Sequence, residues 1–380
     1  MTQTASEGST GGARRAANGS TLALYALAHA AVDAVCAGLL WTAVHDGAIS
    51  ATTAWTAFFL YNFLAFAIQP LVGIVVDRSD APRRFAAFGG LLTAAAIPLA
   101  LAPRAFFAAV VLAGLGNAVF HVGGGVVSLR FLPGKAWPPA LFVAPGAAGV
   151  AGGIALGKVG GPVWLLAAGL IVVVACLLVL PAPSQRVAAA AATRRTGAFA
   201  LEVAALLILV VVGVRSYVGM TLSFPWKGQA ALLVALTAGV VLGKALGGVF
   251  ADRFGWRTVG VGALLVAPVL LAFGADSAAL GIAGALIFNL TMPVTLVAVA
   301  YAMPGHEGFA FGLTCLALFV GAAPALAGWG PALSTTTLIL LSGCAAVALW
   351  FALGRPRLAG SSSPVSRGAS RGAIGAERSY

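Results

Sequence analysis

Charged residues are scarce in this 380-residue chain: Asp, Glu, Lys and Arg together make up 8% of it, whereas 61% is hydrophobic. Roughly a quarter of the residues are charged in an ordinary soluble domain. The shortage therefore excludes a water-soluble globular protein. Segments that alternate apolar and polar residues, the pattern of a transmembrane β-barrel, are also missing. The composition predicts an all-α protein that crosses a membrane many times.

Cysteine pairs, metal-binding spacings and catalytic motifs are lacking as well. The four cysteines lie singly in apolar segments and predict neither disulfides nor a metal site. A partial phosphate-binding loop, Gly152-x4-Gly157-Lys158, has Val159 where Ser or Thr would hold Mg²⁺. No nucleophile and base have the spacing of a catalytic pair. We therefore expect no enzyme, no ATP-driven pump, no resident metal and no cofactor.

Long apolar runs fill most of the chain. A helix needs about 20 such residues to span the hydrocarbon core. Twelve stretches qualify and predict twelve transmembrane helices in two six-helix bundles, 21–181 and 198–354. A cytoplasmic linker, 182–197, would join the bundles, and the tails 1–20 and 355–380 read as disordered. The twelve helices are expected at 21–45, 51–76, 84–102, 105–130, 138–158, 162–181, 198–223, 228–251, 257–274, 277–303, 308–329 and 333–354.

The net charge of +12 follows from membrane topology. If both termini are cytoplasmic, eighteen Lys and Arg residues, Lys244 among them, fall on the inner side, three fall outside and Arg215 lies inside a helix. This is the positive-inside bias, so no nucleic-acid partner is needed to explain the charge. Heavy use of Ala, Gly and Arg is typical of a GC-rich bacterial genome. We expect a monomer in the lipid bilayer of the bacterial inner membrane.

One charged motif occurs twice. Gly73-Ile-Val-Val-Asp77-Arg78 returns 175 residues later as Gly248-Val-Phe-Ala-Asp252-Arg253. Each copy closes an apolar run and precedes further basic residues. Such a repeat at half-length indicates a duplicated membrane domain, the construction of many secondary transporters, with the substrate path between the halves.

The repeated turn, between predicted helices 2 and 3 and again between 8 and 9, resembles the signature loop of the major facilitator superfamily. The second copy keeps the family's glycine at Gly255, whereas Asp80 and Ala81 stand near that place in the first. A carboxylate on such a turn can bind the N-terminus of a neighbouring helix and hold one conformation. We expect a conformational gate made of Gly73, Asp77, Arg78, Gly248, Asp252, Arg253 and Arg257.

Four further stretches resemble the fosmidomycin-resistance branch of that superfamily. They are Ala28-His29-Ala-Ala-Val-Asp33, Gln69-Pro70-Leu-Val-Gly73, Gly114-Leu-Gly116-Asn-Ala-Val-Phe120-His121 and Arg215-Ser216. The resemblance implies a secondary transporter that exports a small organic compound or drug in exchange for protons. Two alternatives are proton-coupled uptake or facilitated diffusion of a metabolite, and a membrane sensor or scaffold that transports nothing.

Ionisable residues at membrane depth are the candidates for proton coupling. Asp33 lies about 18 Å into the first predicted helix, and His29 is one turn below it on the same face. A charge at that depth costs at least about 2.5–3.5 kcal/mol, which favours a function. His121 is a third candidate, for protons or substrate. The alternative for all three is hydrogen bonding between helices in uncharged form.

Arg215 and Asn289 are the remaining candidates for substrate binding. Arg215 lies about 25 Å into the seventh predicted helix, and Glu202 is too far along that helix to pair with it. We expect Arg215 to face a water-filled cavity and attract an anionic substrate group; the alternative is snorkelling to the outer interface. For Asn289 the alternative is a hydrogen bond between helices.

Overall fold

The computed structural model describes residues 4–47, 49–102, 104–179, 198–329 and 333–354. These residues form helices and turns, with no strand among them. The predicted linker 182–197 and the tail 355–380 lie outside the described residues. The N-terminal tail differs from the prediction, because helix α1 begins at Thr4 and continues to His45. No proline interrupts the sequence between these two residues, so nothing in the backbone stops the helix there.

The first half of the chain contains eight α-helices and one π-helical segment: α1 (Thr4–His45), α2 (Ala51–Asn62), η1 (Phe63–Ala67), α3 (Gln69–Ser79), α4 (Pro82–Ala100), α5 (Phe106–Phe131), α6 (Trp137–Val143), α7 (Gly146–Lys158) and α8 (Val163–Val179). The second half contains seven α-helices and a short 3₁₀ helix: α9 (Ala198–Thr221), η2 (Pro225–Gly228), α10 (Ala230–Phe254), α11 (Trp256–Ala272), α12 (Ala278–Asn289), α13 (Thr291–Ala302), α14 (Glu307–Leu326) and α15 (Thr335–Leu353).

Nine helical stretches in the described part of the chain are long and apolar enough to cross a membrane. Three of these are broken helices, namely α2–η1–α3, α6–α7 and α12–α13. The shorter apolar helices α8 and α11, together with α4, bring the arrangement to a number consistent with the predicted twelve. The breaks fall close to Pro70, Pro145 and Pro293, because proline removes a backbone donor from the helical ladder.

Glycine allows the helices of each half to approach closely. A methyl group at Gly149 or Gly153 of α7 would collide with the backbone carbonyls of Ala30 and Ala34 in α1. Gly243 and Gly247 of α10 likewise lie against the backbone of α12 and of the break that follows it. Close backbone approach is how membrane helices gain packing energy when lipid supplies no hydrophobic driving force.

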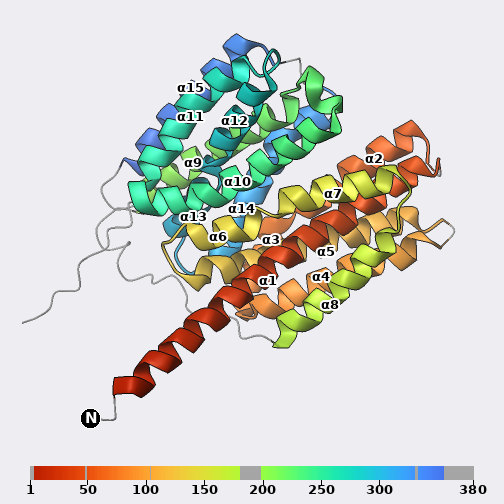
Figure 1. Cartoon of the computed structure of the whole chain (residues 1–380), viewed down its shortest axis with the longest axis horizontal. Coiled ribbons are helices and arrows are strands. Elements are labelled where there is room, and N and C mark those ends of the chain that lie inside the picture. Colours follow the sequence, from red (N-terminus) through yellow and green to blue (C-terminus); the bar gives the residue numbers. More distant parts are fainter. Residues whose placement is uncertain (1–3, 48, 103, 180–197, 330–332, 355–380) are drawn as a thin grey trace, which may run out of the picture.

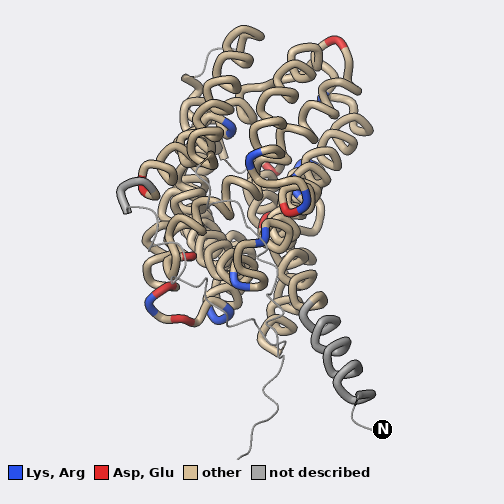
Figure 2. The backbone as a smooth tube through the Cα atoms, turned by 90° about the vertical axis from the view of Figure 1, so that its left-hand side faces the viewer, with Lys and Arg blue, Asp and Glu red and all other residues tan. Residues whose placement is uncertain are grey.

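The two halves form two bundles, drawn from red to yellow-green and from green to blue (Figure 1). They meet where α14 packs on α3 and where α10 packs on α6. Both contacts lie near the turns that follow Asp77 and Asp252, and we call this end of the molecule the gate end. Charged residues are sparse along the tube apart from the turns and a few isolated positions inside the bundles (Figure 2).

Lys244 corrects the predicted distribution of charge. The sequence placed it in a cytoplasmic segment, but α10 continues to Phe254. Two turns of helix therefore separate Lys244 from the turn at Asp252, and the lysine lies within the span. The predicted positive-inside bias is little changed, because seventeen Lys and Arg residues are still expected on the inner side against three outside.

Candidate functional site

Asp33, His29 and His121 form one cluster, although the sequence separates His121 from the other two. His29 Nε2 lies 3.2 Å from Asp33 Oδ2, and His121 Nε2 lies 3.6 Å from Asp33 Oδ1. The two Nε2 atoms are 2.9 Å apart. All three residues are buried, with Asp33 only 9% exposed. We call this group the proton-site triad, and it joins α1 to α5.

Asn117 holds the triad from α5. Its side-chain amide donates to Asp33 Oδ1 at 3.1 Å and to the hydroxyl of Tyr61 at 3.0 Å. Its backbone carbonyl lies 2.9 Å from His121 Nδ1. A carbonyl only accepts, so Nδ1 of His121 carries the proton, and Nε2 of a neutral His121 is an acceptor. His29 Nε2 is then the donor, and its Nδ1 has no partner among the described residues.

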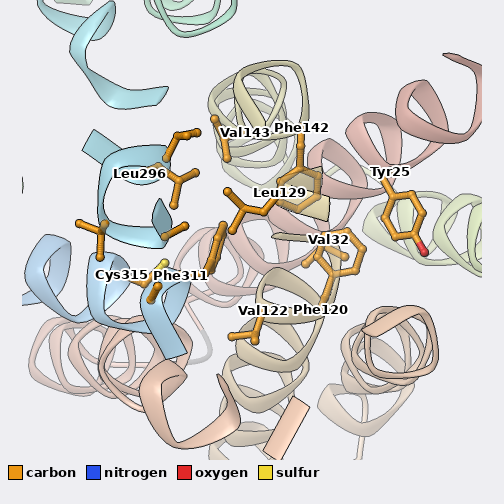
Figure 3. Close-up of a cluster of buried hydrophobic side chains, with 14 of the residues drawn as sticks. Tyr25, Val32, Phe120, Val122, Leu129, Phe142, Val143, Leu296, Phe311 and Cys315 are labelled. Carbon is orange, nitrogen blue, oxygen red and sulfur yellow. The ribbon is translucent and has the colours of Figure 1, made fainter. Parts of the chain in front are cut away.

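An aromatic layer separates the triad from the gate end. His29 lies 4.7 Å from Phe142, ring centre to ring centre, and Phe142 lies 6.4 Å from Phe311 of the other bundle. Figure 3 shows Phe120, Phe142, Leu129 and Phe311 converging where α1, α5, α6 and α14 meet. Phe311 fills the space left by Gly125, where a methyl group would strike its ring. The layer thus places buried aromatic rings of both bundles beside the triad.

The triad's donor atoms all lie within 4.8 Å of one another, and imidazole and carboxylate are also ligands of transition metals. No His or Cys spacing in the sequence signals this, because the cluster is assembled from two helices. In the observed geometry each of these atoms contacts another member of the triad. The lone pairs that a metal ion would need are therefore directed at groups within the triad.

Arg215 of α9 is buried, at 7% exposure, which argues against snorkelling to the surface. Its Nε has no hydrogen-bond partner and no carboxylate lies beside it in the described ranges. The ring of Phe288 lies 5.9 Å from its guanidinium. Asn289, the next residue, donates its amide to the carbonyl of Ala285 in its own helix at 2.8 Å. The amide nitrogen of Asn289 thus bonds within its own helix and not to a neighbouring helix.

Lys244 lies on the face of α10 that meets the first bundle. Gly248, one turn along, touches Ala136 and Ala140 of α6, and Asp252 follows a further turn away. Lys244 is partly buried and makes no ion pair or hydrogen bond within the described residues. Its charge interacts with those of Asp33 and Arg215. The first bundle thus contains a carboxylate–histidine cluster, and the second contains two cations with no ion pair among the described residues.

The first copy of the gate joins α3 to the N-terminus of α14. Asp77 accepts from the backbone N–H of Gly308 at 2.8 Å and of Phe309 at 2.9 Å. Gly73, one turn earlier, lets the backbone of Gly308 come into contact. A carboxylate at a helix N-terminus satisfies donors that have no partner inside the helix.

The second copy repeats this arrangement between α10 and the N-terminus of α6. Asp252 accepts from the N–H of Ala136 at 3.0 Å with both of its oxygens, and from the N–H of Trp137 at 3.0 Å. Gly248 provides the close contact in the place of Gly73. Both carboxylates therefore cap a helix of the opposite bundle, as the repeat predicted.

Among the residues that the structure describes, a buried ion pair reinforces the first copy and none reinforces the second. Arg130 of α5 is 2% exposed, and its Nη2 lies 3.0 Å from Oε2 of Glu307, which is fully buried at the start of α14. Its Nη1 reaches Asp80 at 2.6 Å. Asp80 occupies the position of Gly255 in the second copy and has a positive φ of 50°. Asp80, where the first copy departs from the family pattern, thus provides a second carboxylate for Arg130.

The other arginines predicted for the gate lie outside these contacts. Arg78 and Arg253 are exposed, and Arg253 lies 5.6 Å from the ring of Phe254. Arg257 packs over Trp350 at 3.1 Å, within its own bundle. The sequence missed Arg130, Glu307, Asn117 and Lys244. Of these, Lys244 had a readable signal, since it stands eight residues before Asp252 in an apolar run.

Comparison with known proteins places the fold. No family model matches the chain, and no curated protein matches it. Solved structures do match. The fucose:proton symporter FucP of E. coli aligns with a TM-score of 0.61 at 14% identity, over 87% of this chain and 97% of that one. The human organic anion transporter MFSD10 gives 0.61 at 16% identity, over 87% and 97%. FucP in the outward conformation gives 0.55 at 12%, over 87% and 98%.

The chain therefore has the fold of the major facilitator superfamily transporters, a multi-pass helical membrane fold. These structural neighbours are transporters and not enzymes. Identities of this size establish the fold alone.

Proposed function

We propose that this protein is a proton-coupled secondary transporter of a small organic anion. The observation that carries the proposal is the proton-site triad, a carboxylate and two histidines in mutual contact at membrane depth. Buried ionisable groups are costly in a membrane, and they recur in proton relays. The triad can hold its protons in more than one arrangement because its two Nε2 atoms and the carboxylate share them.

The substrate end of the proposal rests on Arg215 and Lys244. Both cations lie inside the second bundle without an acidic partner among the described residues. An uncompensated guanidinium is well suited to a carboxylate or phosphonate group, which it binds with two parallel hydrogen bonds. His121 of α5, in the first bundle, is a further candidate for substrate binding as well as for protons. Asn289 stays a candidate only if its amide leaves Ala285.

The gate end would be the cytoplasmic side, as the distribution of Lys and Arg predicts, with both termini inside the cell. In this arrangement Asp77 and Asp252 hold the cytoplasmic side closed by capping α14 and α6. The substrate path would then open to the opposite side. Alternating access follows if the caps are released and the two bundles rock about the site.

The direction of transport has two candidates. The resemblance to the fosmidomycin-resistance family favours export in exchange for protons. Proton-coupled uptake is favoured by the distribution of charge between the bundles, as argued below. A sensor without transport is disfavoured, because it would give no use to the two unpaired cations.

The proposal is tested with tag-free protein in proteoliposomes. A panel of small organic acids and their neutral amides is offered under an imposed pH gradient of either sign, and accumulation is measured. We expect accumulation of at least one acid under one sign of gradient, and none of its amide. If no compound accumulates under either sign, or if amides accumulate as well as acids, the proposal is wrong.

A further inference from the structure

We propose that Lys244 links the anion to the proton positively, so that each strengthens the binding of the other and the two cross the membrane together. This inference rests on the proposed function and adds the sign of the coupling. It starts from the repeat. Lys244, Gly248 and Asp252 follow one another on one face of α10, and their equivalents on α3 are Gln69, Gly73 and Asp77. The second half thus has a cation where the first has an amide.

The direction in which Lys244 acts follows from the packing of α10. Gly248 and Asp252 both contact α6, so the same face one turn further along is directed to the junction of α6 with α7. Gly146, at the start of α7, lies directly beneath His29 and Asp33, where a methyl group would strike both side chains. Lys244 therefore faces the triad across the boundary between the bundles.

The other groups around the triad do not supply a competing charge. Tyr61 of α2 is partly buried, Cys36 of α1 is buried, and both are uncharged and linked to the triad through Asn117. Cys315 of α14 is a buried thiol. Arg83 and Glu307 belong to the gate end, and the charge of Glu307 is neutralised by Arg130. The charges that reach Asp33 from the second bundle are thus positive.

The sign of the linkage follows from Coulomb's law. An uncompensated Lys244 opposes the addition of a proton to the triad, because like charges repel. An anion bound at Lys244 and Arg215 cancels that repulsion and raises the proton affinity. Linkage is reciprocal, so a protonated triad in turn binds the anion more tightly. An exchanger needs the opposite sign, with each ligand weakening the other.

The measurement is a histidine titration that needs no transport. The chain has four histidines, so His45→Asn with His306→Asn leaves His29 and His121 as the reporters. Ring-labelled histidine is followed by NMR in lipid nanodiscs as the pH is varied. Lys244→Gln introduces the amide that Gln69 provides in the first copy of the repeat. This change should raise the proton affinity of the two histidines on the order of tenfold. Lys244→Arg keeps the charge and should titrate like the parent.

The ligand arm uses benzoate, with benzamide as its neutral counterpart of the same shape. In the parent, benzoate should raise the proton affinity and benzamide should leave it unchanged. In Lys244→Gln the effect of benzoate should be reduced. An unchanged titration in folded Lys244→Gln would overturn the inference. A parent protein whose proton affinity benzoate lowers or leaves unchanged would overturn it too. If Lys244→Gln does not fold, the benzoate titration of the parent decides alone.

The two proposals fail separately. If the titration shows positive linkage but vesicles accumulate nothing, the proposed function is wrong and the electrostatic linkage stands. If a pH gradient drives transport but benzoate lowers the proton affinity, the protein is an exchanger and this inference is wrong.

Discussion

The two halves of the molecule share a gate and differ in what lies behind it. Each places an aspartate on a tight turn and uses it to cap a helix of the other half, Asp77 on α14 and Asp252 on α6. Among the described residues, the first half alone adds a carboxylate–histidine cluster and a buried ion pair to the other bundle. In the same part of the chain, the second half alone has cations inside a span without an ion pair. In the function proposed above, the half that holds the cluster binds protons and the half that holds the cations binds the anion.

The largest effect is expected at the triad. Asp33→Asn removes the carboxylate and imitates its protonated state, so the proton can no longer be bound and released in each cycle. Accumulation driven by a pH gradient should fall to background, whereas downhill movement of the same compound should persist. Vesicle uptake with and without the gradient measures both. Accumulation at the level of the parent would move the proton site away from Asp33.

The next effect is expected at the ion pair that only the first half has. Arg130→Gln leaves the buried Glu307 carboxylate without its arginine, and breaking a buried pair in this way costs about 3–5 kcal/mol. The gate end should open more often and expose Cys315 of α14. Maleimide labelling of Cys315, with the other three cysteines changed to serine, reports this opening. Arg253→Gln, an exposed arginine of the other half, is the control and should label like the parent.

A smaller effect should come from the two caps themselves. Asp77→Asn and Asp252→Asn each weaken charge-assisted hydrogen bonds worth about 1.5–3 kcal/mol. Transport should slow while substrate affinity changes only a few-fold, because neither carboxylate touches the substrate. The Asp252 variant should be slowed more than the Asp77 variant. When Asp77 is changed, the Arg130–Glu307 ion pair still holds the first copy closed. Equal slowing in initial-rate measurements would mean that the ion pair contributes nothing to closure.

Arg215 tests the assignment of the anion to the second half. Arg215→Lys keeps a positive charge but loses the planar fork that binds a carboxylate with two hydrogen bonds. Affinity for a transported acid should fall about tenfold, the equivalent of the roughly 1.4 kcal/mol expected from one lost charged hydrogen bond. A neutral analogue should bind as before. Equal losses for both compounds would assign Arg215 a packing role.

The smallest effect is expected from Asp80→Gly, which makes the first turn resemble the second. Glycine relieves the positive φ, and the same change removes a contact of Arg130 with a side chain that is half exposed. These contributions oppose each other, so stability should change by no more than about 1 kcal/mol. Thermal unfolding in detergent measures it. A large loss would show that Asp80 matters to Arg130 as much as Glu307 does.

The sequence predicted what depends on local pattern. Hydrophobic runs gave the helices, the repeat gave the two halves, and an i, i+4 spacing placed His29 beside Asp33. It could not place His121 in the same cluster, since 88 residues separate it from Asp33 and only the packing of α5 on α1 joins them. Arg130 and Glu307 were missed for the same reason. Lys244 was misplaced because the end of an apolar run does not mark the end of a helix.

The caps have a further consequence for how the protein tolerates change. In both, the donors are backbone N–H groups, at Gly308 and Phe309 in one and at Ala136 and Trp137 in the other. Every amino acid except proline supplies that group, so half of each closure is written in the peptide chain and not in its side chains. At Phe309, Ala136 and Trp137 the cap therefore does not depend on the side chain of the donor residue, whereas at Gly308 a side chain would collide with Gly73 and Asp77.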